Sequence, residues 1–206
     1  MKCSLKRETL LRAQGHNLIA GIDEAGRGPL AGPVVAGAAI LPPKFRHKVL
    51  RDSKLLSAGQ RERIYDELTT REDVFWSVAV VATEDVDRLN ILQATYLAMR
   101  LALESLRHVP DHVLIDGRPV PGFPVVHTAI IDGDNISFSI AAASVIAKVT
   151  RDRIMLDFDQ QFPAYGFAQH KGYSTALHLE RLRLHGPCPI HRRSFYPVQQ
   201  MDLPLD

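Results

Sequence analysis

Acidic side chains that could hold a metal ion stand at the ends of short apolar runs in this sequence. These acids are Asp23, Glu24, Asp116 and Asp134. Carboxylates that gather at the strand ends of one sheet repel one another and raise one another's pKa, so a divalent cation is their natural neutralising partner. Oxygen ligands without nitrogen or sulfur favour Mg²⁺ or Mn²⁺ over Zn²⁺. The pattern therefore indicates an acidic metal site.

Ordinary turn chemistry is the alternative interpretation of the Asp-Gly pairs, because both residue types are favoured in turns. We interpret Asp132 in this way. The adjacent acids Asp23 and Glu24 fit a turn less well, since a turn needs only one acid. Neighbouring side chains on a strand point to opposite faces, so these two reach one site only if the strand ends or twists there. Gly26 and Gly28 provide that exit. From the residues alone, turn chemistry and metal binding both stay open.

The elements that must position these acids can be predicted from hydrophobic periodicity. Apolar, β-branched runs bounded by Gly and Pro predict five strands, at 17–23, 33–41, 74–82, 111–117 and 123–133. The first three lie close enough in the chain to pair antiparallel. A helix between the third and fourth strands allows the later strands to run parallel in the same sheet.

Helices are predicted where apolar residues recur at helical spacing, at 83–106, 137–162 and 174–186, with Gly186 closing the last. Ser57 and Gln60 form a capping-box pattern that starts a shorter helix. The order of elements predicts an α/β fold, with a mixed five-stranded sheet flanked by helices and a helical C-terminal portion.

Composition indicates one globular domain over residues 1–206, because 46% hydrophobic content in 206 residues suffices for one sizeable core. We expect the sheet and core helices in 17–160, a helical substrate-binding portion in 161–198 and a flexible tail in 199–206. Two cysteines, Cys3 and Cys188, are too few for a disulfide framework or a zinc site. The absence of an apolar leader or a membrane span predicts a cytoplasmic protein with no membrane partner. We also expect a monomer.

A net charge of only +2 means that a nucleic-acid partner would have to be held by a local patch. The candidate is the stretch 165–195, which has five Lys and Arg residues and the single acid Glu180. A solvated helix face followed by a loop is the alternative interpretation of this stretch.

Motifs along nearly the whole chain are similar to those of a known family. The stretch DEAGRGPLAGPV at 23–34 resembles the type 2 ribonucleases H. Further motifs follow in family order: DSKLLS at 52–57, LIDG at 114–117, DGDN at 132–135, AAASVIAKVTRDR at 141–153, HKGYST at 170–175 and GPCPIHRRSF at 186–195. The resemblance implies the ribonuclease H-like fold.

The resemblance also implies an activity, the endonucleolytic hydrolysis of RNA paired with DNA, including incision on the 5′ side of a single ribonucleotide in duplex DNA. It implies two divalent ions, Mn²⁺ or Mg²⁺, and products with 5′-phosphate and 3′-hydroxyl ends. The catalytic metal ligands it implies are Asp23, Glu24, Asp116 and Asp134. Asp152 resembles a family aspartate that lies near the metals, whereas the alternative is an ion pair with Lys148 one helical turn earlier.

Substrate contacts are implied by the same resemblance. Gly26, Arg27 and Gly28 resemble the loop whose backbone touches the ribose 2′-hydroxyl, and a tight turn at this place is compatible with that role. Tyr173 is similar to a tyrosine that packs on the sugar, although it could instead cap the core. Candidate phosphate contacts are Lys54, Lys171, Arg192 and Arg193. The chain departs from the family pattern at Leu55, often a lysine, and at Ser174, usually a glycine.

Two other function classes match parts of the sequence. A small-molecule phosphohydrolase with an Asp nucleophile would use acids at strand ends, but leaves the Gly-Arg-Gly loop and the basic stretch without a role. A non-catalytic nucleic-acid-binding module would keep the basic residues and lose the acids, all of which are present.

The C-terminal stretch QQMDLPLD at 199–206 resembles the short peptide with which bacterial replication and repair proteins dock on the DNA sliding clamp. The residues that carry this resemblance are Gln200, Met201, Leu203 and Leu205. A frayed, exposed terminus is the alternative.

Overall fold

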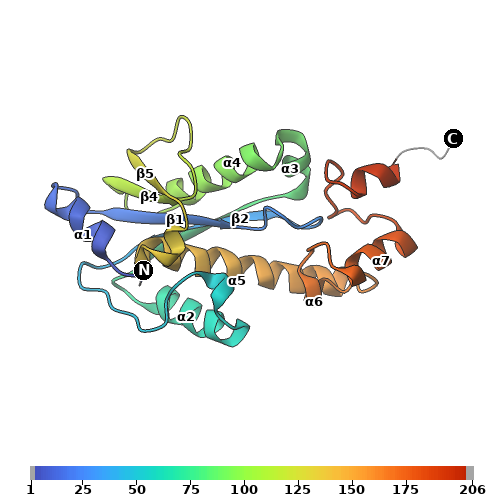
Figure 1. The fold of residues 1–206 in the computed structure, drawn as a ribbon, viewed down its shortest axis with the longest axis horizontal. Helices are drawn as coiled ribbons and strands as arrows, with labels where there is room; N and C mark the ends of the chain where they lie inside the picture. The colour runs from blue at the N-terminus through green and yellow to red at the C-terminus, as the bar shows by residue number, and fades with distance from the viewer. Residues whose placement is uncertain (1–2, 203–206) are drawn as a thin grey trace.

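The computed structural model describes residues 3–202, and in these residues a five-stranded mixed sheet lies between layers of helices (Figure 1). The strands are β1 (Ile19–Ala25), β2 (Val34–Ile40), β3 (Phe75–Val81), β4 (His112–Asp116) and β5 (His127–Ile130). Their order in the sheet is β3-β2-β1-β4-β5. The first three pair antiparallel, and β1, β4 and β5 run parallel, which confirms the predicted mixed sheet.

The register between β1 and β4 brings two acids to the same edge of the sheet. The last paired residues of these parallel strands are Ile22 and Ile115. The next residue on each strand is an aspartate, Asp23 on β1 and Asp116 on β4. Because parallel strands end in the same direction, both carboxylates emerge side by side.

Helices cover both faces of the sheet. They are α1 (Lys6–Ala13), α2 (Ala58–Thr70), α3 (Thr83–Leu89), α4 (Ile91–Glu104), α5 (Phe138–Gln161), α6 (Phe167–His170) and α7 (Ala176–His185). In Figure 1, α4 lies on one face, α5 and α2 lie on the other, and α6 and α7 extend beyond the end of the sheet. None of the helices within residues 3–202 is long and apolar enough to cross a membrane.

The predicted helix 83–106 is wrong as a single helix, because the chain breaks at Asn90. Asn90 has a φ of 68°, outside the helical region, so α3 ends there and α4 begins one residue later. Its side-chain oxygen accepts hydrogen bonds from the backbone N–H groups of Leu92 and Gln93, which caps α4. The predicted capping box of Ser57 and Gln60 is present at the start of α2.

The helix α1 was not predicted from the sequence. Its Glu8 is fully buried and accepts hydrogen bonds from the Ser137 hydroxyl at 2.6 Å and from the Ser139 N–H at 3.0 Å. Glu8 therefore sits at the N-terminus of α5, where a negative charge is favourable. This contact fixes the start of the helix that packs under the sheet.

The helix α5 approaches the sheet closely because two strand residues have no side chain. A Cβ atom at Gly21 would lie 2.1 Å from the Ser139 carbonyl carbon, and one at Gly37 would lie 2.4 Å from the Ala143 oxygen. The first half of α5 is apolar and almost entirely buried, as the sequence predicted. The sheet and α5 thus form a rigid frame for the acids at the strand ends.

The predicted flexible tail is wrong for its first residues. A 3-10 helix spans Val198–Asp202, in which Val198 is fully buried. Met201 packs against the small core formed by Leu30 and Leu182, so this stretch docks on the protein's own surface. Leu203 and Leu205 lie outside the described residues.

Candidate active site

Three of the four predicted acids come from β1, from β4 and from the turn that follows β5. Asp23 lies on β1 and Asp116 ends β4, while Asp134 lies in the 3-10 turn Gly133–Asn135 that follows β5. The turn is tied to the strand because the N–H of Gly133 donates to Asp116 Oδ1 at 2.7 Å. The side chains of Asp23 and Asp134 are buried, at 5% and 4% exposure. Asp132, the residue just before the 3-10 turn, has a φ of 54° and is the predicted turn residue.

Glu24 shares this site with its neighbour although β1 continues through both residues. Burial raises the pKa of Asp23 well above its usual value, and the charges of Glu24 and Asp116 raise it further. Burial also raises the pKa of Glu24, against the opposing effect of Arg27, whose Nη1 lies 3.1 Å from Glu24 Oε1. The charge of Asp116 raises the pKa of both Asp23 and Glu24, so the three carboxylates belong to one site.

The pKa of Asp134 is raised as well. Burial, followed by the charges of Asp52 and Asp116, raises its pKa to about 7. Burial also raises the pKa of Asp116, in spite of the Gly133 N–H and Lys54. Four carboxylates are therefore held together at an energetic cost that rises as they ionise.

A hard divalent cation fits this donor set, because all the donors are carboxylate oxygens whose mutual repulsion it would relieve. In residues 3–202, however, no three acidic, His or Cys side chains already stand in a metal-binding arrangement. The acids instead turn toward local partners: Asp23 Oδ1 accepts from the N–H of Glu24 at 2.7 Å, and Glu24 faces Arg27. Metal binding would need rotation of these side chains within a fixed backbone frame.

A cleft of about 550 Å³ opens over the acids and brings several predicted substrate contacts together. Its lining includes Glu24, Asp116, Gly26, Arg27, Gly28, Lys54, Lys148 and Tyr173. Tyr173 is 42% exposed, so it forms a wall of the cleft and does not cap the core. A Cβ atom at Gly28 would lie 3.9 Å from Tyr173 Cε1, at van der Waals contact, so the Gly28 backbone lies near the tyrosine ring with room for a methyl group between them.

Arg192 does not contact phosphate, which corrects the sequence prediction. The residue is fully buried, and its guanidinium donates to the carbonyl oxygens of Gly26, Arg27, Pro29 and Gly32 at 2.6–3.0 Å. All of these acceptors lie in the loop between β1 and β2 that contains the Gly-Arg-Gly motif. Arg192 therefore holds the shape of the loop and has no donor left for a ligand.

Arg151 is a second buried arginine that the sequence analysis missed. It lies on α5 and donates at 3.0 Å to the carbonyls of Ala31, Pro33 and Lys171. Gly26, at a φ of 98°, has room only for hydrogen, because a Cβ atom there would lie 2.2 Å from Arg151 Nε. Sequence alone marks Arg151 only as a polar residue within a predicted helix.

The ion-pair alternative for Asp152 is present in the structure. Lys148 Nζ lies 2.6 Å from Asp152 Oδ1, and Arg61 Nη2 lies 3.7 Å from Oδ2. Asp152 does not line the cleft, whereas Lys148 does, with its ammonium 5.9 Å from the Tyr173 ring centre. Asp152 is thus paired with Lys148, and its place near the metals stays a prediction.

The remaining predicted phosphate contacts differ in their surroundings. Lys54 is exposed in the cleft; burial would lower its pKa, but Asp52, Asp23 and the other nearby aspartates together raise it. The Lys171 ammonium donates to the Ala168 carbonyl, and Arg193 donates through its side chain to the Pro187 carbonyl. Neither of these two lines the cleft.

A pair of buried histidines fixes the backbone of Tyr173. His178 Nδ1 lies 2.9 Å from the Tyr173 carbonyl, which can only accept, so Nδ1 carries the proton. His178 Nε2 must then accept from His191 Nε2 at 3.0 Å, and His191 Nδ1 accepts from the Cys188 N–H. Burial lowers the pKa of both histidines to about 4, which keeps them neutral. Sequence spacing gave no sign of this pair.

Comparison with known proteins agrees with this geometry. A family model described as Ribonuclease HII matches residues 20–198. A ribonuclease HII from Polaromonas sp. is 55% identical over 194 residues, which cover 94% of this chain and 97% of the relative. The crystal structure of ribonuclease H2 from Pyrococcus horikoshii superposes with a TM-score of 0.75 at 29% identity, over 90% of this chain and 97% of that one.

A second solved structure is the complex of PCNA with RNase HII from Archaeoglobus fulgidus. It superposes with a TM-score of 0.72 at 26% identity and covers 87% of this chain and 95% of that one. The fold and the order of the motifs are thus shared with ribonucleases of this type along most of the chain.

Proposed function

The chain belongs to the ribonuclease HII family, and from this premise we propose that it incises duplex DNA on the 5′ side of a single embedded ribonucleotide. Membership supports endoribonuclease activity on RNA–DNA hybrids, and the finer specificity is our proposal. The observation that carries it is the cleft, where the Gly28 backbone and Tyr173 face each other beside Glu24 and Asp116. A ribose placed there would meet backbone polar groups at its 2′-hydroxyl, which DNA lacks.

The proposed chemistry divides between the acids and the cations of the cleft. We propose that Asp23, Glu24, Asp116 and Asp134 hold two divalent ions, Mn²⁺ or Mg²⁺. When bound, such ions lower the pKa of an attacking water and stabilise the leaving 3′ oxygen. Lys54 and Lys148 lie in the same cleft and would neutralise phosphate on either side of the scissile bond. Products would carry 5′-phosphate and 3′-hydroxyl ends.

The two other function classes fit the structure less well. A phosphohydrolase with an Asp nucleophile gives no role to the loop that two buried arginines hold beside the acids. A non-catalytic binding module would have no use for four carboxylates whose pKa values are raised, first by burial and in part by neighbouring acids. Family membership favours hydrolysis over both. We further propose that the protein acts as a monomer in the cytoplasm.

The catalytic assignment predicts that Asp23→Asn abolishes cleavage of a labelled duplex with one ribonucleotide, in Mg²⁺ and in Mn²⁺, while the fold stays intact. The amide is neutral and is a poor metal ligand. Asp132→Asn is the matched control, because the exposed Asp132 has a left-handed φ of 54° that asparagine tolerates. Near-native turnover by the Asp23 variant would contradict the assignment, as would cleavage that needs no divalent metal.

Recognition of the 2′-hydroxyl predicts that Gly28→Ala lowers kcat/KM on the single-ribonucleotide duplex roughly tenfold or more, since a lost polar contact costs about 1–3 kcal/mol. The new methyl group would project into the cleft, where only Tyr173 lies within 4 Å. The free energy of unfolding should not change, and chemical denaturation would measure it. A drop in stability with full activity per folded molecule would make Gly28 purely structural.

Gly26→Ala is a contrasting variant, because its Cβ would clash with Arg151 at 2.2 Å in a left-handed conformation. We expect this variant to lose stability as well as activity. Tyr173→Ala should lose activity without a comparable loss of stability, since the ring is 42% exposed.

We also propose that the C-terminal peptide docks on a sliding clamp. The Archaeoglobus fulgidus relative forms a complex with PCNA, which supports a partner of this kind. Met201 packs on the protein's own core, so docking would use Leu203 and Leu205 with Gln200, or would displace Met201.

Clamp docking predicts that Leu203→Ala/Leu205→Ala weakens binding to a purified bacterial sliding clamp, with no change in cleavage of free oligonucleotides. Calorimetric titration of the clamp would measure this, with Asp206→Asn as the matched control at the same terminus. Truncation after Val198 also removes the packed Met201, so it tests the docking peptide less cleanly. Equal binding by the double variant and the full chain, or no binding by either, would overturn the proposal.

A further inference from the structure

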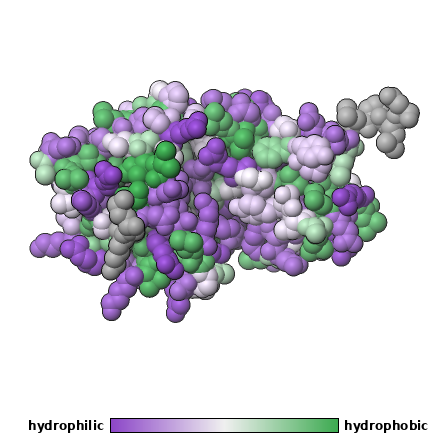
Figure 2. Space-filling model, in the orientation of Figure 1, coloured by the Kyte–Doolittle hydropathy of each residue, from purple (hydrophilic) through white to green (hydrophobic). Residues whose placement is uncertain are grey.

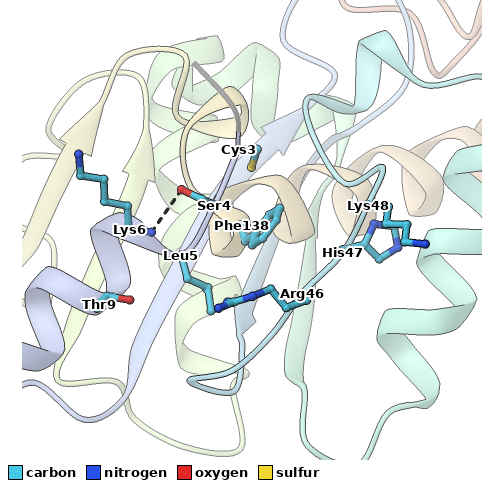
Figure 3. A pocket seen from close by; sticks show the side chains of 9 residues that line it. All are labelled: Cys3, Ser4, Leu5, Lys6, Thr9, Arg46, His47, Lys48 and Phe138. Atoms are coloured by element: carbon cyan, nitrogen blue, oxygen red, sulfur yellow. Dashed lines mark hydrogen bonds between the residues drawn. The ribbon is translucent and has the colours of Figure 1, made fainter.

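A second concave surface lies beside the candidate active site. Two hollows of about 780 and 540 Å³ share Cys3, His47, Lys48 and Phe138 in their linings, so they form one continuous depression. Figure 3 shows the larger hollow, with Phe138 between Lys6 on one side and the segment 46–48 on the other. We call the two hollows together the basic trough.

The smaller hollow of the basic trough lies next to residues of the candidate active site. This hollow is lined by Leu55 and Asn135, which directly follow Lys54 and Asp134 in the chain. Asp134 is also close enough to influence the trough, because its charge adds to the larger effects of burial and of Glu8 in raising the pKa of the Cys3 thiol to about 12. A chain that runs through the cleft can therefore continue into the trough.

The charges along the trough are of one sign. The cations that line it are Lys6, Arg46, Lys48 and Arg51. All four are exposed, and within residues 3–202 none of them forms an ion pair and no Asp or Glu lines either hollow. The segment 42–51, PPKFRHKVLR, holds no acid. In Figure 2, hydrophilic side chains gather at the lower left, where this segment runs between β2 and α2.

The floor of the trough is apolar and anchored. Cys3, Leu5 and Phe138 are each at most 7% exposed, and Phe138 is the first residue of α5. The N–H of Phe138 donates to the Ser4 carbonyl at 3.1 Å, which ties the N-terminal segment to the helix. Exposed cations above an apolar floor suit a polymer with phosphates on its outside and sugars between them.

We propose that the basic trough binds the sugar-phosphate backbone of the nucleic acid that flanks the scissile site, an inference that rests on the proposed function. The carboxylates of Glu24 and Asp116 in the cleft repel phosphate, and a net charge of +2 leaves little general attraction. The trough supplies the missing attraction next to the site. It therefore sets affinity and placement of the duplex and does not read bases.

The trough predicts a change in the salt dependence of binding. Each phosphate contact contributes about 0.9 to the slope of log K against log salt concentration, so Arg46→Gln/Lys48→Gln should lower that slope by about 2. Binding would be measured with a single-ribonucleotide duplex, in an Asp23→Asn background that leaves the duplex intact. The control is Arg107→Glu, an exposed site outside the trough that removes the same net charge. We expect the control to keep the wild-type slope.

Duplexes shortened on one side or the other of the scissile bond, with the bond itself and the base pairs next to it kept, locate the contact in the cleaving enzyme. Shortening the flank that reaches the trough should cost the wild-type protein as much kcat/KM as the double substitution costs on the full duplex, and the two losses should not add. Equal slopes for the double variant and the wild type would overturn the proposal that the trough binds the sugar-phosphate backbone. An equal slope change in Arg107→Glu would overturn it as well. A double-variant loss that persists when both flanks are shortened would also overturn it. A wild-type protein that fails to cut the single-ribonucleotide duplex would instead overturn the proposed function.

Discussion

The repulsion among four carboxylates at one end of the sheet is the constraint around which the rest of the structure is organised. Burial raises the pKa of these acids and neighbouring acids raise the pKa of Asp23 and Asp134 further, so an unconstrained chain would move them apart and into water. The parallel pairing of β1 with β4 prevents this for Asp23 and Asp116, because both follow the last paired residues of neighbouring strands. The hydrogen bond from Gly133 to Asp116 then brings Asp134 to the same place. The free energy that stabilises the sheet and α5 offsets the electrostatic cost of holding these acids close together.

The proposed substrate recognition depends on two buried arginines, and burying their charges also costs free energy. Burial lowers the pKa of Arg192 to about 9 and of Arg151 to about 10, so each guanidinium is charged in a place that disfavours charge. Both are satisfied by backbone carbonyls, most of them in the loop between β1 and β2. A loop held in this way presents its backbone at Gly28 without using side chains, which suits contact with a 2′-hydroxyl.

Strands and acids could be predicted from the sequence because their signals are local. Apolar runs bounded by Gly and Pro mark the strands, and the acids follow those runs directly. The break at Asn90 was missed because the apolar period continues through it, so the left-handed residue is visible only in its backbone angle. The role of Arg192 depends on partners 160 or more residues away. A separation of 129 residues hides the contact of Glu8 with Ser137, and with it the reason that α1 exists.

The most direct test of this account is the number of protons released when the protein binds Mn²⁺. Carboxylates with raised pKa values must lose their protons to become ligands, and the pKa of Asp134 is about 7. Calorimetric titration near that pH, in buffers with different enthalpies of ionisation, measures the release. The account predicts proton release by the wild-type protein that declines as pH rises and is smaller in Asp134→Asn. Metal binding without proton release, or equal release by the variant, would contradict it.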